Sequence, residues 1–465
     1  MQSEFRAMGN IQLLVDFGST LTKVVAIDLK EEVIISRAQV PSTVDEDITV
    51  GLRNAIRKVR ADVDLSSSEE GETLACSSAA GGLRMVAIGF VPDLTCEAAN
   101  RAALNAGAKV IGCYSNEITQ QEMAEIEEML PDIILLAGGT DGGNRKVILH
   151  NASALANSRS LKAHIVVAGN KAAQDEAKAI LAGMGKEVSL TKNVMPQIGT
   201  LDIDPCREVI RETFIRNIIQ AKGIAKARTI VKDIIMPTPV AVLTAAQLLA
   251  EGYHEEKGWG ELIVVDVGGA TTDVHSIATG APTKGGVVLT GLPEPYVKRT
   301  VEGDLGVRHN IHTLVEQAQK RGLLAGEDHE DIVAKFTRIE KLPENEEEVA
   351  FDEALAAAAL HIATERHSGR IELVYGPTGE IPVQRGKDLT QVGTVIGTGG
   401  PVIFSRAPKR ILEHALFDDS KAFSLRPKQA QFYVDNKYIM YAVGLLAKTN
   451  PNKAMSIAKK YITRL

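Results

Sequence analysis

Two segments, far apart in the chain, follow one pattern: an apolar strand, an aspartate, a glycine-rich turn, a threonine and a second strand. Residues 11–28 read IQLLVDFGSTLTKVVAID, and residues 261–278 read ELIVVDVGGATTDVHSIA. Short runs rich in β-branched residues that flank a few turn residues are typical of β-hairpins. The recurrence predicts two hairpins that belong to two related lobes.

The first hairpin contains the residue types that an anion site needs. Gly18 allows the backbone to approach an anion closely, because it has no Cβ. Successive turn amides can form an anion-binding nest, to which Ser19 and Thr20 add hydroxyl groups. Lys23 adds a positive charge, and Asp16 ends a strand that we expect to be buried. Taken alone, an ordinary hairpin with an aspartate-capped turn explains this segment equally well.

The second hairpin repeats the arrangement around Asp266. Its turn and second strand contribute Gly268, Gly269, Thr271, Thr272 and Asp273. Two carboxylates that face each other repel unless a cation lies between them. Mg²⁺ takes oxygen ligands and keeps several waters, so two carboxylates and phosphate oxygens suit it. A plain turn explains either hairpin separately, but the pair predicts a site for the phosphates of a magnesium nucleotide.

Further motifs resemble those of the actin, Hsp70 and sugar-kinase ATPases. DFGSTLTK (16–23) resembles their first phosphate loop and DVGGATTD (266–273) their second. PTPVAVLTAAQLLAEG (237–252) is similar to the helix that links the lobes, VIGTGGPV (395–402) to the adenosine loop, and 437–448 to the second linking helix. The resemblance implies ATP or ADP with Mg²⁺ as cofactors, Asp16, Asp266 and Lys23 as catalytic residues, and Asp16 and Asp266 as magnesium ligands through water. The nucleotide-binding residues it implies are Gly18, Ser19, Thr20, Thr22, Gly268, Gly269, Ala270, Thr271, Thr272, Gly397, Thr398, Gly399 and Gly400.

More closely, six segments together resemble the MutL/GlmL accessory proteins of adenosylcobalamin-dependent glutamate (methylaspartate) mutase and related aminomutases. They are DFGSTLTK, SSAAGGLRMVAIG, LLAGGTDGGN, MPTPVAVL, RTVEGDLGVR and VIGTGGPVIF. This resemblance runs along essentially the whole chain. It implies an ATPase-like chaperone that reactivates such a mutase, with the mutase as its protein partner.

The expected fold is α/β: a two-lobed, actin-like (ribonuclease H-like) ATPase fold with an inserted α/β subdomain. Apolar runs that alternate with alanine-rich segments between about 80 and 200 indicate a parallel α/β unit. We therefore expect a first lobe over 1–80, the insert over 81–205, completion of the first lobe over 206–255, the second lobe over 256–436, and a linking helix over 437–465.

Composition narrows the partners and the compartment. The net charge of −7 argues against nucleic acid or an anionic membrane as the main partner. No apolar run is long enough to span a bilayer, and the N-terminal residues do not resemble a secretory signal. The four cysteines, Cys76, Cys96, Cys113 and Cys206, have no metal-ligand spacing, so we expect neither a disulfide framework nor an iron–sulfur cluster. A cytoplasmic protein is expected, and whether it forms a homo-oligomer stays open.

Some features leave the activity open. Hsp70-type proteins have a glutamate where Thr238 lies, so we expect slow hydrolysis. Asp273, Glu302 and Asp304 are candidates for the cleft, although a helix cap with exposed charges explains RTVEGDLG (299–306) equally well. His275 lies on the same side of its strand as Asp273, where an isolated histidine is more often structural than catalytic. A small-molecule kinase of the same fold and an actin-like filament protein remain the alternative functions.

Overall fold

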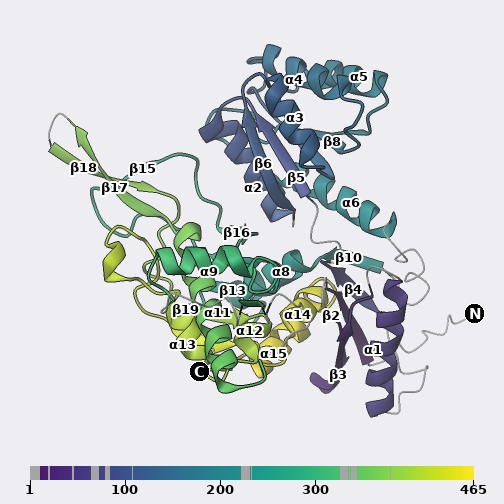
Figure 1. Ribbon diagram of the computed structural model, residues 1–465, viewed down its shortest axis with the longest axis vertical. Coiled ribbons are helices and arrows are strands. Elements are labelled where there is room, and N and C mark those ends of the chain that lie inside the picture. The colour runs from purple at the N-terminus through teal and green to yellow at the C-terminus, as the bar shows by residue number, and fades with distance from the viewer. Residues whose placement is uncertain are drawn as a thin grey trace, which may run out of the picture. The chain divides into compact units, whose positions relative to one another are not determined.

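The computed structural model describes most of the chain, in two compact units. The described residues are 11–18, 21–43, 47–63, 73–78, 84–106, 108–220, 231, 233–324, 333–334, 336, 343–376 and 379–465. Unit 1 comprises Met1–Ala79, Gln220–Thr290 and Glu294–Leu465, and unit 2 comprises Ala80–Ile219 and Gly291–Pro293. Figure 1 shows their elements, with those of unit 2 in blue to teal.

The first sheet of unit 1 is built around the first predicted hairpin. Its strand order is β10-β4-β1-β2-β3. The strands are β1 (Ile11–Phe17), β2 (Leu21–Asp28), β3 (Val33–Pro41), β4 (Leu74–Ser77) and β10 (Asp233–Pro237). β1, β2 and β3 are antiparallel neighbours, whereas β4 runs parallel to β1 and β10 parallel to β4. Helix α1 (Ile48–Val63) packs against β2 and β3.

The second sheet of unit 1 repeats this plan around the second hairpin. Its order is β16-β14-β13-β19-β20-β21. The strands are β13 (Leu262–Val267), β14 (Thr272–Ile277), β16 (Val297–Glu302), β19 (Thr394–Thr398), β20 (Gln431–Val434) and β21 (Thr463–Arg464). β13, β14 and β16 are antiparallel neighbours, and β19 and β20 continue parallel to β13. Strands β16 to β20 thus repeat the order and directions of the five strands of the first sheet, and β21 adds a sixth strand antiparallel to β20. This repetition confirms the predicted actin-like, ribonuclease H-like fold.

Two apolar helices lie in one core between the sheets. They are α8 (Thr238–Glu251) and α14 (Met440–Ala447), and α15 (Pro451–Tyr461) follows them. Their core contains Leu14 and Val25 of the first sheet together with Val264 and Ile396 of the second. A Cβ on Gly444 of α14 would collide with the backbone of Ala241 of α8, so the two helices cross backbone to backbone.

Other helices cover the opposite face of the second sheet. They are α9 (Ile311–Lys320), α11 (Glu346–His367), α12 (Gly400–Ile403) and α13 (Pro408–Glu413). Their apolar residues form a separate core with Val265 and Val395. A small sheet of β15 (Val288–Thr290), β17 (Arg370–Gly376) and β18 (Gly379–Arg385) and a two-stranded ribbon of β11 (Gly252–Tyr253) and β12 (Glu256–Lys257) complete the unit.

Unit 2 is a parallel α/β unit, as the alternating pattern predicted. Its strand order is β6-β5-β7-β8-β9. The strands are β5 (Arg84–Gly89), β6 (Lys109–Ser115), β7 (Ile133–Leu136), β8 (His164–Val167) and β9 (Val188–Leu190), all parallel. The helices are η1 (Pro92–Cys96), α2 (Glu97–Asn105), α3 (Gln120–Glu128), α4 (Lys146–Asn157), α5 (Gln174–Gly183) and α6 (Asp204–Gln220). The unit extends to Ile219 and includes nearly all of the continuous helix α6.

One expectation about the cysteines is wrong. Cys96 and Cys113 form a disulfide within unit 2. They are 17 residues apart in sequence, but η1 packs against β6 and brings them together. Cys76 and Cys206 are free and buried. In the part of the chain that the structure describes, no helix is long and apolar enough to cross a membrane.

Candidate functional site

The first hairpin places Asp16 and Lys23 opposite each other. Asp16 is the sixth residue of β1, is 1% exposed, and faces Lys23 of β2 in the antiparallel register. The Lys23 ammonium lies 2.9 Å from the Asp16 carboxylate. Burial lowers the pKa of Lys23, but Asp16 overcomes this effect and holds that pKa well above its usual value. Lys23 is therefore a charged, paired lysine at the mouth of the hairpin.

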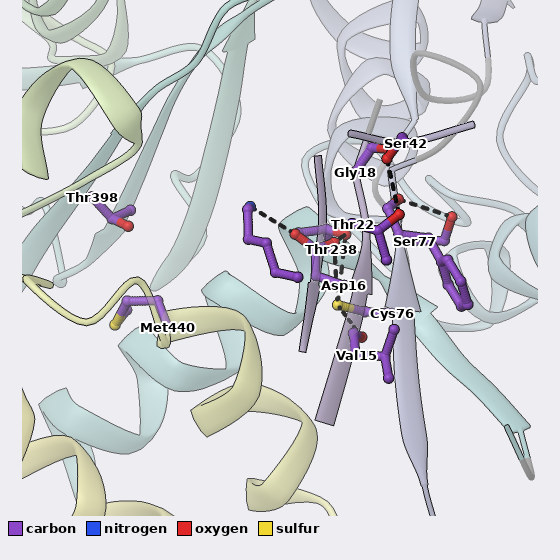
Figure 2. A network of polar contacts seen from close by, with 12 residues as sticks. Val15, Asp16, Gly18, Thr22, Ser42, Cys76, Ser77, Thr238, Thr398 and Met440 are labelled. Carbon is purple, nitrogen blue, oxygen red and sulfur yellow. Dashed lines mark hydrogen bonds and ion pairs between the residues drawn. The ribbon is translucent and has the colours of Figure 1, made fainter. Parts of the chain in front are cut away.

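Two more side chains from neighbouring elements contact Asp16 (Figure 2). Thr238, the first residue of α8, donates its hydroxyl to the carboxylate at 2.6 Å. Cys76 lies beside Asp16 on the parallel strand β4 and donates its thiol at 3.7 Å. Burial and the negative charge of Asp16 raise the pKa of the Cys76 thiol well above its ordinary value. Thr238, predicted to replace a catalytic glutamate, thus contacts the site through a hydroxyl.

The turn of the first hairpin is held by backbone and hydroxyl contacts. The Gly18 amide donates to the Leu21 carbonyl at 3.1 Å, which closes the turn. Ser42 donates to the Gly18 carbonyl at 2.7 Å and lies 3.0 Å from the hydroxyl of Thr22, which is fully buried. Ser19 and Thr20, and also 79–83 of the SSAAGGL segment, lie outside the described residues.

The second hairpin is anchored through its carbonyl groups. Its turn closes with a 2.9 Å hydrogen bond from the Gly268 amide to the Thr271 carbonyl. The segment after β16 donates backbone amides to the carbonyls of Gly268 and Gly269, and Asn310 donates its side-chain amide to that of Ala270. Thr272 donates its hydroxyl to the Leu305 carbonyl. The second turn is therefore fixed to the 305–310 segment.

Asp266 is the least compensated carboxylate of the site. It is only partly buried, and within the described residues its carboxylate forms no hydrogen bond or ion pair. Burial raises its pKa to about 7, Asp273 and Asp16 contribute in the same direction, and Lys23 opposes them. Charged residues of the first hairpin, Asp16 and Lys23, therefore affect the pKa of Asp266 in the second hairpin.

Asp273 already has a counterion. The Arg299 guanidinium of β16 lies 2.6 Å from the Asp273 carboxylate, and Thr271 donates its hydroxyl to it at 2.9 Å. His275, two residues further along β14, is completely buried, and neither ring nitrogen has a hydrogen-bond partner in the described part of the chain. Burial lowers its pKa to about 3, so the ring is neutral and well suited to a structural role.

Glu302 and Asp304 form an ion cluster with α11. Arg366 donates to Glu302 at 2.6 Å and to both carboxylate oxygens of Asp304 at 2.9 and 3.0 Å. Gln317 of α9 also donates to Asp304. Although burial alone would raise it, the pKa of Asp304 is lowered by the bonds from Arg366 and Gln317. These two residues thus fasten the end of β16 to the helices.

The predicted adenosine loop lies directly beside Asp266. Thr398 of β19 is paired with Asp266 of β13 in the parallel register, and Gly399 follows with φ of 91°. A Cβ at Gly399 would lie 2.7 Å from an Asp266 carboxylate oxygen, so only glycine fits there. Gly400 begins α12, whereas the missing side chain of Gly397 makes room for Leu412 and Val402 of the core.

Sequence reasoning missed Asp435, which follows β20 and is fully buried. Its carboxylate accepts the backbone amides of Ile439 and Met440 at 2.8 and 2.9 Å, and the Thr398 hydroxyl at 3.1 Å. Burial raises its pKa to about 6 although these bonds oppose the shift. Asp435 lies five residues before α14, outside the N-cap position, so no local capping signal identifies it. Asp435 connects the adenosine loop with the start of α14.

Comparison with known proteins identifies the family. A model of the MutL protein family matches residues 12–462. Protein MutL of Clostridium tetanomorphum is 48% identical over 459 residues, which are 97% of this chain and 99% of that protein. The chain belongs to the MutL protein family. The predicted family resemblance is thereby confirmed.

Solved structures show more distant likenesses to this MutL family member. The nucleotide-free structure of acetone carboxylase, which acts in ATP-dependent acetone carboxylation, is 13% identical, covers 94% of this chain and 70% of its own, and has a TM-score of 0.42. Gluconate kinase from Lactobacillus acidophilus is 11% identical over 98% of this chain and 93% of its own, with a TM-score of 0.36. Ethanolamine utilization protein EutJ from Carboxydothermus hydrogenoformans is 12% identical over 97% and 93%, with a TM-score of 0.28. Because these scores are low, the fold assignment rests on the two matching strand orders.

Proposed function

We propose that this chain is an ATP-binding accessory protein that reactivates or protects an adenosylcobalamin-dependent carbon-skeleton mutase. Glutamate (methylaspartate) mutase or a related aminomutase is the expected partner, as the MutL/GlmL resemblance implies. The observation that carries the proposal is the pair of matching hairpins, one in each sheet, each with an aspartate near the end of its first strand. The proposed work is a nucleotide-dependent movement of the two lobes.

The residues around Asp266 fit a magnesium nucleotide. Asp266 is a carboxylate with no partner among the described residues, and its pKa is raised by burial, so a cation beside it would remove an electrostatic cost. Gly399 leaves its backbone next to that carboxylate, where a side chain would block the approach. A bound magnesium ion would neutralise phosphate charge there. Asp266 would hold it, directly or through water, while Lys23 would supply a positive charge to the phosphates.

Two tethers would connect the nucleotide site with the helices between the lobes. Thr238 bonds Asp16 of the first hairpin and begins α8. Asp435 bonds Thr398 beside the second hairpin and the first amides of α14. A shift of either hairpin would therefore displace the start of a linking helix. Rotation of packed elements around a bound ligand is a common way to pass on such a shift.

Hydrolysis in this proposal is slow. Asp16, Asp266 and Lys23 remain the proposed catalytic residues, but Asp16 is already paired with Lys23 and Thr238. A threonine hydroxyl cannot act as a general base with the strength of a carboxylate. Nucleotide binding and exchange therefore account for the function better than rapid turnover does.

The decisive experiment supplies purified protein, ATP and Mg²⁺ to an inactivated cobalamin mutase and measures its turnover. We expect activity to return with the wild type and to be lost with Asp266→Asn, while Asp419→Asn, a change at an exposed aspartate of the same unit, serves as the matched control. If no mutase regains activity, the reactivating role is wrong. A phosphorylated metabolite formed in step with ATP loss would support a kinase, and nucleotide-dependent light scattering would support a filament.

A further inference from the structure

Tyr438 has a backbone conformation that a tyrosine rarely adopts. Its φ is 55°, in the left-handed region, and it lies between β20 and α14. Bulky residues in this region are outliers, and such strain collects at functional sites. Glycine would adopt the same conformation without cost. A tyrosine at this position therefore indicates that its side chain is needed.

The Tyr438 ring contacts the lysine of the first hairpin. The Lys23 ammonium lies 3.8 Å from the centre of the Tyr438 ring and 5.8 Å from that of Tyr441. The same ammonium lies 2.9 Å from the Asp16 carboxylate, and the Lys23 side chain is only 13% exposed. Lys23 belongs to the first sheet, whereas Tyr438 follows the fifth strand of the second. The contact thus joins the two lobes through one cation.

The backbone around Tyr438 is fixed to the second lobe. The Tyr438 amide donates to the Asp435 carbonyl at 2.9 Å. The Asp435 carboxylate caps the next two amides, those of Ile439 and Met440, and accepts the Thr398 hydroxyl. A displacement of the ring would therefore act directly on the first turn of α14 and on the end of β19.

We propose that Tyr438 is a positioning residue that couples the binding of a phosphate group at the first hairpin to the conformation of the segment that begins α14. Its ring and Asp16 together hold the Lys23 ammonium, and a phosphate group bound at the hairpin draws the ammonium away from the ring. This step rests on the proposed nucleotide site. Its direction follows from chemistry, because a charge-assisted bond to a phosphate oxygen is stronger than the attraction of an ammonium to an aromatic face. Loss of the ring contact then frees the segment that begins α14.

Two substitutions separate the ring from the backbone strain. Tyr438→Phe keeps an aromatic face over Lys23 and removes only the hydroxyl, which also interacts with Lys23, so it should stay much closer to the wild type than a variant without the ring. Tyr438→Gly removes the ring and relieves the left-handed strain, and this relief offsets part of the packing that is lost with the ring. Denaturation midpoints of both variants establish that each is folded before their contacts to Lys23 are compared.

The first test needs no nucleotide. An amine-reactive reagent is added to the full-length protein at fixed pH, and the labelling of Lys23 is followed by peptide mass spectrometry. We expect Tyr438→Gly to label roughly 2- to 30-fold faster than Tyr438→Phe and the wild type, the range that a cation–π contact supplies. Equal labelling in all three proteins would show that the ring does not position Lys23 and would overturn the inference.

The second test adds ATP with Mg²⁺ and measures hydrogen exchange at the Ile439 and Met440 amides. In the wild type and Tyr438→Phe, ATP should change their exchange, whereas Tyr438→Gly should bind ATP as tightly or more tightly without that change. An unchanged response in Tyr438→Gly contradicts the inference even if ATP binds. If the wild type binds no ATP, the proposed function fails instead, and the labelling test still decides whether Tyr438 positions Lys23.

Discussion

The two hairpins occupy equivalent places in their sheets but balance their charges differently. In the first, the residue opposite Asp16 is Lys23; in the second, the residue opposite Asp266 is Asp273. Asp16 is therefore neutralised within its own hairpin, while Asp273 draws its counterion, Arg299, from the next strand. Asp266 has no such partner in the described part of the chain. The first hairpin thus contains the counterion of its own aspartate, whereas Asp266 of the second hairpin would be stabilised by an added cation.

This difference suggests a division of labour between the halves. A buried carboxylate with a salt bridge and a hydroxyl donor has its desolvation repaid by its partners. The desolvation of Asp266 is not fully compensated, because its pKa is raised to about 7. We therefore expect Asp16 to matter most for stability and Asp266 most for ligand binding.

The largest effect should come from Asp16→Ala. It leaves the mostly buried Lys23 ammonium without its counterion, so the free energy of unfolding of unit 1 should fall by about 3–5 kcal/mol. Chemical denaturation followed by the fluorescence of Trp259, the single tryptophan, reports on this unit. The double variant Asp16→Ala with Lys23→Met should regain most of the loss. If Asp16→Ala is as stable as the wild type, the ion pair with Lys23 does not stabilise the first hairpin, and the proposed difference between the two hairpins is wrong.

The second prediction concerns the pH dependence that Asp266 causes. Its pKa is about 7 in the fold, against about 3.9 in an unfolded chain. Between these values the folded state keeps a proton that the unfolded state has released, so stability falls as the pH rises, by at most about 1.4 kcal/mol per pH unit. Asp266→Asn should remove this slope and be the more stable protein above pH 7, where the wild type has lost the contribution of the protonated carboxyl.

The contribution of Asp266 is obtained as the difference in stability between the wild type and Asp266→Asn at each pH, because a second carboxylate titrates in the same range. Asp435 has a pKa raised to about 6 by burial and contributes a slope of the same sign. Denaturation midpoints of the wild type, Asp266→Asn and the exposed-site control Asp419→Asn between pH 4 and pH 8 isolate the Asp266 contribution. If the midpoints of the wild type and Asp266→Asn change in parallel with pH, the charge of Asp266 has a counterpart in the fold, and the predicted difference from Asp16 is wrong.

The smallest effect should come from Thr238→Val. It keeps the shape of the side chain but removes the hydroxyl that donates to Asp16 at 2.6 Å, so we expect a loss of about 1.5–3 kcal/mol in the free energy of unfolding. Thr238→Ser, which retains the hydroxyl, is the matched control and should lose less. If both variants lose the same free energy of unfolding, the hydroxyl bond to Asp16 does not stabilise the protein, and the loss comes from the packing of α8.

Local patterns predicted the hairpins and the fold well. The apolar runs on either side of the first turn match β1 and β2 closely, because short apolar runs and turn residues are read directly from neighbouring positions. The duplicated hairpin also predicted the two sheets of unit 1. The parallel α/β character of the insert was predicted from its alternation of apolar runs and alanine-rich segments.

Long-range contacts were the part that could not be predicted. The bond of Thr238 to Asp16 joins residues 222 positions apart, and Tyr438 meets Lys23 only when both lobes have folded. The Cys96–Cys113 disulfide depends on the packing of η1 on β6, which no cysteine spacing reveals. The exchange of Lys23 for Asp273 is visible within the two motifs, whereas the partners from other elements, Thr238 for Asp16 and Arg299 for Asp273, could not be read from them.

The backbone crossing of Gly444 and Ala241 has a mechanical consequence. Helices usually lock their angle by fitting ridges of side chains into grooves, and changing that angle requires repacking. At Gly444 the absence of a side chain lets the two backbones touch, and any Cβ there would collide with Ala241. A larger residue at 444 would therefore push α14 away from α8 and change the angle at which the two helices rest.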